Sequence, residues 1–222
     1  MSPAGSSTDA DAIRLVVRIW LPDRPGALGL VASRIGALGA DIVGIDVLER
    51  SEHIAVDEFA VVLPGEELVP LLVREIGEVD GASVEEWQLV DRFPDPRLDA
   101  LETVEQIAQA SETHDLALRL TNGVRAEFNA TWSALIRGSD VLGAVGEDVP
   151  DASVLDALAA GTTASPAVAA GEAGPDDLAI APLDKLGAML LVGRDGHAFR
   201  RRERQQLLAL ARIADRFADL VS

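Results

Sequence analysis

The order of apolar patterns between Asp11 and Val90 is the feature that most constrains the fold. Alternating apolar residues indicate strands, and apolar residues three and four positions apart indicate helices. In sequence order the strand-like and helix-like segments are Ile13–Ile19, Leu28–Leu38, Ile42–Leu48, Ile54–Leu63, Leu68–Ile76 and Val84–Val90. The order strand, helix, strand, strand, helix, strand predicts a ferredoxin-like α+β domain over residues 11–91, with both helices on one face of the sheet.

A proline-rich segment without periodicity separates this first unit from the rest of the chain. Two prolines lie between Asp91 and Arg97, which predicts an interdomain linker at residues 92–97. Small and polar residues from Met1 to Ala10 predict a flexible tail. We expect residues 98–222 to form a second α+β domain, in which an opening and a closing helix flank an antiparallel sheet.

Several elements of the second unit are predicted from local patterns. The opening helix has an apolar stripe that includes Leu98 and Leu101, and the closing helix has a longer stripe through Leu207 and Phe217. The predicted segments between them are a strand at Leu116–Leu120, a hairpin turn at Thr121–Gly123, further strands within Val124–Ile136, a helix from Asp151 to Gly161, a loop at Thr162–Pro175, and strands at Leu178–Pro182 and Lys185–Val192.

Charge and composition exclude several classes of function. The 222 residues have a formal net charge of −18, and acidic residues exceed basic ones in both units. Nucleic acid and anionic membranes would repel such a surface. No apolar run approaches the ~20 residues of a membrane span, and the absence of cysteine fits a reducing compartment, so we expect a cytoplasmic protein.

Motifs for catalysis or metal binding are missing from the sequence. The three histidines are far apart, and no cysteine can serve as nucleophile or thiolate ligand. There is no G-x-S-x-G, P-loop or G-x-G-x-x-G pattern. The chain is therefore expected not to be an enzyme and to require no metal or cofactor.

The first unit resembles the ACT domain family. The similarity rests on Leu21–Leu28, with its D-R-P-G-A-L pattern, and on Ile35–Ile42, which ends in G-A-D-I. Val56–Phe59 in the third predicted strand also fits the family pattern. The resemblance implies the βαββαβ fold, a tendency to form dimers, and binding of amino acids or similar metabolites to regulate an enzyme or another partner.

The candidate ligand-binding residues come from this motif and number eight. They are Asp23, Arg24, Pro25, Gly26, Ala27, Leu28, Asp41 and Ile42. A glycine lets the backbone approach a ligand closely, and a helix N-terminus suits a carboxylate. The resemblance implies that Asp41 contacts the ligand from a neighbouring subunit. The family more often has Asn there, and an Asp favours an ammonium group, hence an α-amino acid.

Ordinary structural roles are an alternative for the same residues. Pro25–Gly26 is common turn chemistry at a helix start, and Asp23 and Asp41 can cap adjacent turns.

The second unit resembles a GAF domain over Asp177–Leu183, Leu186–Gly193 and Phe199–Arg204. The resemblance implies a sensor or a dimerisation scaffold, and it does not specify a ligand.

Two hypotheses of function follow. The first is a homodimeric regulatory protein that binds a small metabolite, an amino acid, through its ACT-like domain and modulates a separate protein partner. The second is a pure dimerisation or protein-interaction module without a small-molecule ligand.

Overall fold

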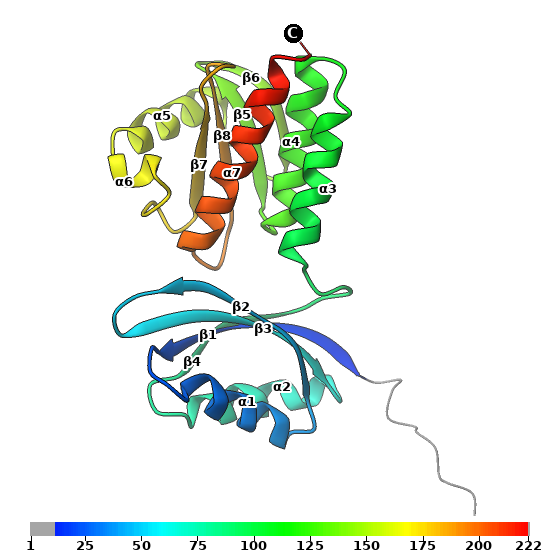
Figure 1. The fold of residues 1–222 in the computed structure, drawn as a ribbon, viewed down its shortest axis with the longest axis vertical. Helices are drawn as coiled ribbons and strands as arrows, with labels where there is room; N and C mark the ends of the chain where they lie inside the picture. Colours follow the sequence, from blue (N-terminus) through cyan, green and yellow to red (C-terminus); the bar gives the residue numbers. More distant parts are fainter. Residues whose placement is uncertain (1–11, 222) are drawn as a thin grey trace, which may run out of the picture. The chain divides into compact units, whose positions relative to one another are not determined.

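The structure, a computed structural model, describes residues 12–221 and divides them between Phe93 and Pro94 into two compact units. The predicted flexible tail, residues 1–10, lies outside the described residues. Each unit is α+β and contains a four-stranded antiparallel sheet (Figure 1). The division falls within the segment that the prolines predicted as a linker.

The N-terminal unit has the predicted order of elements. They are β1 Ile13–Pro22, α1 Ala27–Ala37, β2 Asp41–Arg50, β3 Ile54–Leu63, a 3₁₀ turn Glu66–Leu68, α2 Val69–Gly77 and β4 Ser83–Leu89. The sheet order is β2-β3-β1-β4, so β2 and β4 are its edges. Both helices lie on one face of this sheet (Figure 1). The ferredoxin-like arrangement predicted from the sequence is thus present in the structure.

Alternation along the strands decides which residues of the N-terminal unit enter the core. Leu15, Val17 and Ile19 of β1 point to the helix side and are fully buried. Their partners Phe59 and Val61 on β3 lie on the same side, against Val31, Ile35, Leu72 and Ile76 of the helices. Odd-numbered positions of β1 and β3 therefore face the core, which matters below because Asp57 is one of them.

The C-terminal unit has helices on both faces of its sheet. Its elements are α3 Pro96–Ala108, α4 Thr113–Glu127, β5 Trp132–Arg137, β6 Asp140–Gly146, α5 Ala152–Thr163, α6 Pro166–Ala169, β7 Leu178–Leu183, β8 Ala188–Gly193 and α7 Arg201–Ala218. The sheet order is β6-β5-β8-β7. One core cluster joins the sheet to α3, α4 and α7, and a smaller one joins the other face to α5.

The predicted strand at Leu116–Leu120 and the hairpin turn after it are wrong, because both belong to helix α4. Leu116, Leu120 and Val124 are buried at helical spacing. The polar turn residues fit inside the helix: Thr121 Oγ1 donates to the Ala117 carbonyl at 2.8 Å. A Cβ at Gly123 would lie 2.5 Å from the Thr103 side chain, so glycine permits close packing of α3 on α4.

Other predictions for this unit need smaller corrections. The sequence predicts one or two strands within Val124–Ile136. In the structure, the first residues of this segment continue α4, and β5 is the strand that it contains. Strand β6 was not predicted, and α6 lies within the predicted loop. The last strand starts at Ala188 instead of Lys185, because the amides of Lys185 and Leu186 bind the Asp215 carboxylate.

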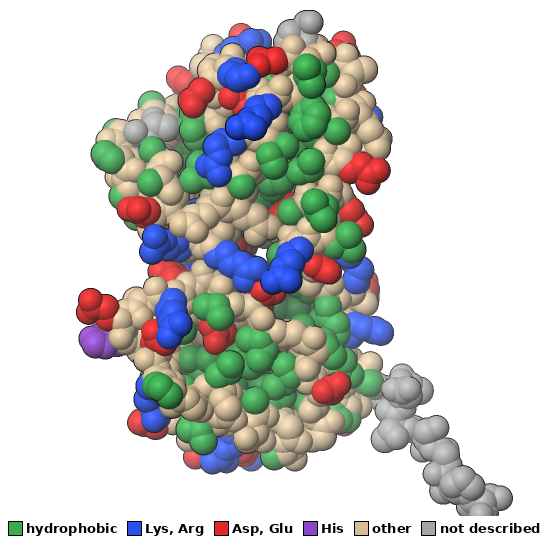
Figure 2. Space-filling view, viewed as in Figure 1, with side chains coloured by type: hydrophobic (Ala, Val, Ile, Leu, Met, Phe, Trp, Pro, Cys, Tyr) green, Lys and Arg blue, Asp and Glu red, His purple; other side chains and the backbone are tan. Residues whose placement is uncertain are grey.

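Only part of the apolar stripe predicted for the opening helix faces the core, at Val104. Leu98 and Leu101 are exposed on α3, Leu101 to 66%, whereas Thr103 and Ile107 are buried. Hydrophobic side chains gather over α3 and α4 on the face shown in Figure 2. Helix α7 buries Leu208 as well as Leu207 and Leu210, so this part of its apolar surface is used within the unit, whereas Leu220, just after the helix, is 76% exposed.

Candidate functional site

Helix α1 begins without a side-chain cap. Its N-cap residue is Gly26, with φ 89° and ψ −13° in the left-handed region that glycine adopts without strain. The Gly26 carbonyl accepts the first helical bond from Leu30 at 3.0 Å. A Cβ built on Gly26 meets nothing within 4 Å, so the backbone at this turn is open. The N-terminus of α1 therefore presents backbone N–H groups and the positive end of the helix dipole, and both suit an anion.

Asp23 does not cap α1, contrary to the structural alternative considered for it. Its carboxylate accepts two bonds of 2.7 Å from Arg50, at the end of β2. Hydrogen bonding by the Arg50 guanidinium lowers the pKa of Asp23 below its usual value. The Asp23 amide also donates to the His53 carbonyl at 2.9 Å, which ties the β1–α1 loop to the β2–β3 hairpin. Arg50 is therefore part of the loop's surroundings, although the sequence did not single it out.

Asp57 is a buried acid beside this ion pair. It lies opposite Ile19 of β1 and Val47 of β2, on the helix-covered face of the sheet, and is 5% exposed. Its Oδ1 is buried and has no hydrogen-bond partner among the described residues. Burial raises the pKa of Asp57, the Arg50 charge opposes that rise, and the Asp23 charge adds to it. Sequence reasoning missed this residue as a site residue.

A signal for Asp57 was present in the alternation of its strand. Ala55, Phe59 and Val61 share its parity and are buried in the core. An acid at a core-facing position of a strand needs an explanation, because ionisable side chains are rarely buried without a partner.

Apolar side chains flank Asp57 on the open edge of the sheet. Val47 is its direct cross-strand neighbour and is 48% exposed, and Ile45 on the same face is 39% exposed. Leu28 on α1 is exposed as well. Figure 2 shows hydrophobic side chains gathered between the sheet and the helices of this unit. An apolar surface thus borders the buried carboxylate.

The other predicted residues of the loop divide into accessible and inaccessible ones. Arg24 and Pro25 are exposed, and Arg24 lies 3.9 Å from Asp80. Ala27 is buried in the core, so its side chain cannot contact a ligand there. Its backbone amide donates to the Arg24 carbonyl at 3.3 Å. The accessible part of the predicted set within one chain is therefore Asp23 to Gly26 together with Leu28.

Asp41 and Ile42 are not brought to this loop within one chain. Asp41 opens β2, while the Asp23–Arg50 pair lies at the far end of the same strand. A strand of this length spans roughly 30 Å. Ile42 lies opposite Val61 and packs on the core. Within one chain, neither residue reaches the loop.

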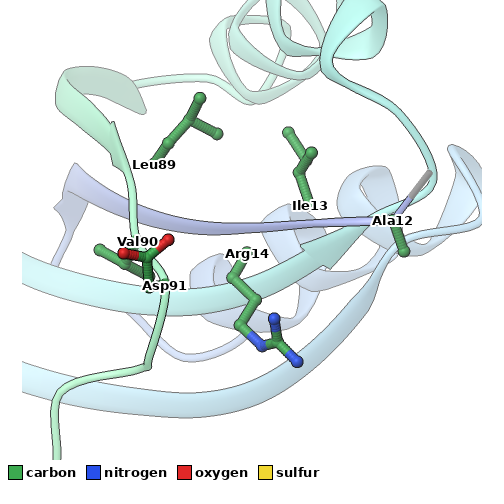
Figure 3. A pocket seen from close by; sticks show the side chains of 6 residues that line it. All are labelled: Ala12, Ile13, Arg14, Leu89, Val90 and Asp91. Atoms are coloured by element: carbon green, nitrogen blue, oxygen red, sulfur yellow. The ribbon is translucent and has the colours of Figure 1, made fainter. Parts of the chain in front are cut away.

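Two cavities lie outside the predicted site. One of about 350 Å³ lies where β1 begins and β4 ends, with Ile13 and Leu89 on one side of β1 and Arg14 on the other (Figure 3). Its lining includes Asp91 but none of the predicted residues. The other, of about 160 Å³, lies in the C-terminal unit beside Trp132 and Asp177. Neither has an unpartnered buried polar side chain in its lining among the described residues.

Glu127, in the C-terminal unit, is a second acid whose pKa is raised by burial. Burial raises the pKa of Glu127 to about 7, against hydrogen bonds from Gln206 and Thr103 and with the help of the Asp99 charge. The Gln206 amide also donates to the Pro96 carbonyl at 3.2 Å. Because Glu127 is on α4 and these partners are on α3 and α7, Glu127 links three helices, and it lines neither of the two cavities described above.

Among residues 12–221, no three His, Asp or Glu side chains form a group that could hold a metal ion. Within the same residues, no helix has the length and apolar character to cross a membrane.

Two of the three comparisons with known proteins found no match. No family model matches the chain, so neither the ACT nor the GAF resemblance is supported at that level. No curated protein matches it. Among solved structures, the chain is similar to the ACT domain from GTP pyrophosphokinase of Chlorobium tepidum, determined by solution NMR. The identity is 14%, the match covers 38% of this chain and 92% of that domain, and the TM-score is 0.30.

Proposed function

We propose that residues 12–93 form an ACT-type regulatory domain that binds a small metabolite, an amino acid, at the β1–α1 loop. The observation that supports this most directly is the uncapped start of α1 at Gly26, beside the Asp23–Arg50 pair. In this proposal the chain is not an enzyme, acts in the cytoplasm and modulates a separate protein partner. The GAF-like second unit serves as a sensor or a scaffold for dimerisation.

The chemistry of the loop suits an anionic group. A carboxylate at the start of α1 would interact with the N-terminal N–H groups and the positive end of the helix dipole. Arg50 adds a guanidinium, and its side chain is 71% exposed and so able to move between Asp23 and a ligand. In a chain with a net charge of −18, the Arg50 guanidinium and the helix dipole are the groups of this loop that would attract a carboxylate.

A homodimer would complete the site. Strand β2 is a sheet edge, and exposed edges offer unpaired backbone groups to another chain. If two copies pair their β2 strands antiparallel about a two-fold axis, the first residues of one β2 lie beside the last residues of the other. That pairing brings Asp41 of the second copy toward the Asp23–Arg50 loop. Exposed Val43, Ile45 and Val47 would be covered by the same contact.

The exposed apolar residues also support the second hypothesis, an interaction module without a ligand. Leu98 and Leu101 on α3 lie open to solvent, as do the β2 residues above. Such surfaces favour contact with another protein chain. Under this alternative, the loop at Gly26 would be a structural turn only.

A thermal-shift screen of the full chain against the twenty free amino acids tests the proposal. An amino acid at a hundred times its dissociation constant adds about 2.7 kcal/mol to the free energy of unfolding. Arg50→Gln should reduce the shift, while Arg34→Gln, which removes an exposed arginine from the last turn of α1, should retain it. A chain whose melting temperature responds to none of the twenty would support the interaction module.

Light scattering coupled to size exclusion tests the dimer. We expect a dimer mass at micromolar protein in moderate salt, and tighter association as salt screens the repulsion between the acidic chains. A monomer mass under these conditions would remove Asp41 from the site.

A further inference from the structure

One oxygen of the buried Asp57 carboxylate, Oδ1, has no hydrogen-bond partner among the described residues, and the whole residue is 5% exposed. Arg50, whose charge acts on Asp57, donates its two hydrogen bonds to Asp23 instead. A buried acceptor without a donor is costly, and native proteins rarely retain one without a use.

A cationic donor would satisfy Asp57, and the surroundings restrict which cations fit. The positive end of α1 lies on the same face of the sheet and repels a purely cationic ligand. A ligand with a carboxylate as well as an ammonium group gains from both features. The exposed edge beside Asp57 is apolar, with Val47 as its cross-strand neighbour and Ile45 next along β2.

We propose that Asp57 is the ammonium-binding residue of this site and that the ligand is an α-amino acid with an apolar side chain. The ligand carboxylate lies at the start of α1 and its side chain lies on Ile45 and Val47. The inference rests on the proposed function and specifies its ligand. Because Oδ1 is covered in the described state, binding requires a displacement, and the exposed Arg50 side chain of the Asp23–Arg50 pair is the group that moves.

The test compares three probes that differ by one group each, using calorimetry on the full chain. L-leucine has the ammonium, the carboxylate and an apolar side chain. 2-Hydroxy-4-methylpentanoate replaces the ammonium with a hydroxyl, and isopentylamine lacks the carboxylate. We expect L-leucine to bind about tenfold to a hundredfold more tightly than either probe, the range that one charge-assisted hydrogen bond provides.

Variants separate the role of Asp57 from that of the loop. Asp57→Asn should remove the preference for L-leucine over the hydroxy acid. Asp46→Asn, on the opposite face of the same sheet, should leave that preference intact. Val47→Thr changes an exposed side chain to a polar one of nearly the same volume, and it should weaken the binding of L-leucine more than the binding of L-alanine.

Each outcome has a defined meaning. If the wild-type chain binds amino acids but Asp57→Asn, folded by circular dichroism, keeps the preference for ammonium, the inference about Asp57 is overturned and the proposed function stands. Preference for a charged or polar amino acid over L-leucine overturns the apolar side-chain assignment. If no amino acid binds to the wild-type chain, both the inference and the proposed function fail.

Discussion

The two units of this chain each have a four-stranded sheet, but one buried charge in each unit, Arg194 and Asp57, has very different hydrogen bonding. In the C-terminal unit, the Arg194 guanidinium donates to both Glu203 oxygens and to the carbonyls of Phe128 and Ala198, at 2.8 to 3.2 Å. It also lies 4.0 Å from the centre of the Phe199 ring. In the N-terminal unit, Asp57 is as deeply buried, yet one of its oxygens has no partner in the described structure.

The comparison separates a structural charge from a candidate functional one. A buried charge whose donors are all used fixes one arrangement of the chain, here the approach of α7 to β8. A buried acceptor without a donor gives up stability and leaves a group available to a ligand. The predictions below test this distinction by the sign of the change in unfolding free energy. Removal of Arg194 should destabilise the C-terminal unit, and removal of the Asp57 charge should stabilise the N-terminal unit.

Arg194→Ala should have the largest effect. It leaves Glu203 buried without its guanidinium partner, which costs about 3–5 kcal/mol of unfolding free energy. Urea titration followed by the helical circular dichroism signal measures this loss. Arg212→Ala, at an exposed position of α7, is the control and should change stability by less than about 0.5 kcal/mol. An unchanged midpoint for Arg194→Ala would show that the network does not stabilise the unit.

Gly26→Val should destabilise the N-terminal unit by about 2 kcal/mol, because a β-branched residue is strained at φ 89°. It should also abolish the response to amino acids. The control is Gly29→Ala, inside α1 with open space around its Cβ, which should gain about 0.5–1 kcal/mol from helix propensity. Equal effects of the two changes on thermal unfolding would argue against the left-handed turn.

Glu127→Gln should change how stability depends on pH. Burial raises the pKa of Glu127 to about 7, so from about pH 4.5 to 7 the folded chain retains a proton that the unfolded chain has lost. Wild-type stability therefore falls as pH rises through this range, and the variant avoids about 1–2 kcal/mol of that loss. Unfolding at pH 5 and pH 8 measures it. Glu102→Gln, exposed on α3, should follow the wild type.

Asp57→Asn should have the smallest effect and the opposite sign to Arg194→Ala. Burial raises the pKa of Asp57, so the cost of its charge is absent at low pH and grows as pH rises above the ordinary value of an aspartate. We expect a gain of about 1 kcal/mol in unfolding free energy at neutral pH. The unfolding free energy of the control, Asp46→Asn, should stay within about 0.5 kcal/mol of the wild-type value. A destabilised Asp57→Asn would reveal a partner for this carboxylate and weaken the contrast between the units.

The candidate site was only partly predictable from the sequence. Motif residues such as Gly26 are contiguous, so a local pattern identified the turn and the start of α1. Arg50 and Asp57 are distant from Asp23 in sequence, and only the pairing of β1, β2 and β3 places them together. The alternation of β3 marks Asp57 as core-facing, but the register of the sheet is needed to name its neighbours.

The sequence by itself determined the order of elements in the N-terminal unit, because strand alternation and helical spacing there are regular and are separated by clear turns. In the C-terminal unit, tertiary packing decided. Thr121 and Asn122 have turn propensity, yet their side chains bond carbonyls within α4, and Gly123 lets α3 approach. Leu98 and Leu101 look like a core stripe, yet Thr103 and Ile107 face inward. Burial against neighbouring elements outweighs local propensity, which is worth only a few tenths of a kcal/mol per residue. A local sequence pattern does not show which elements will be those neighbours.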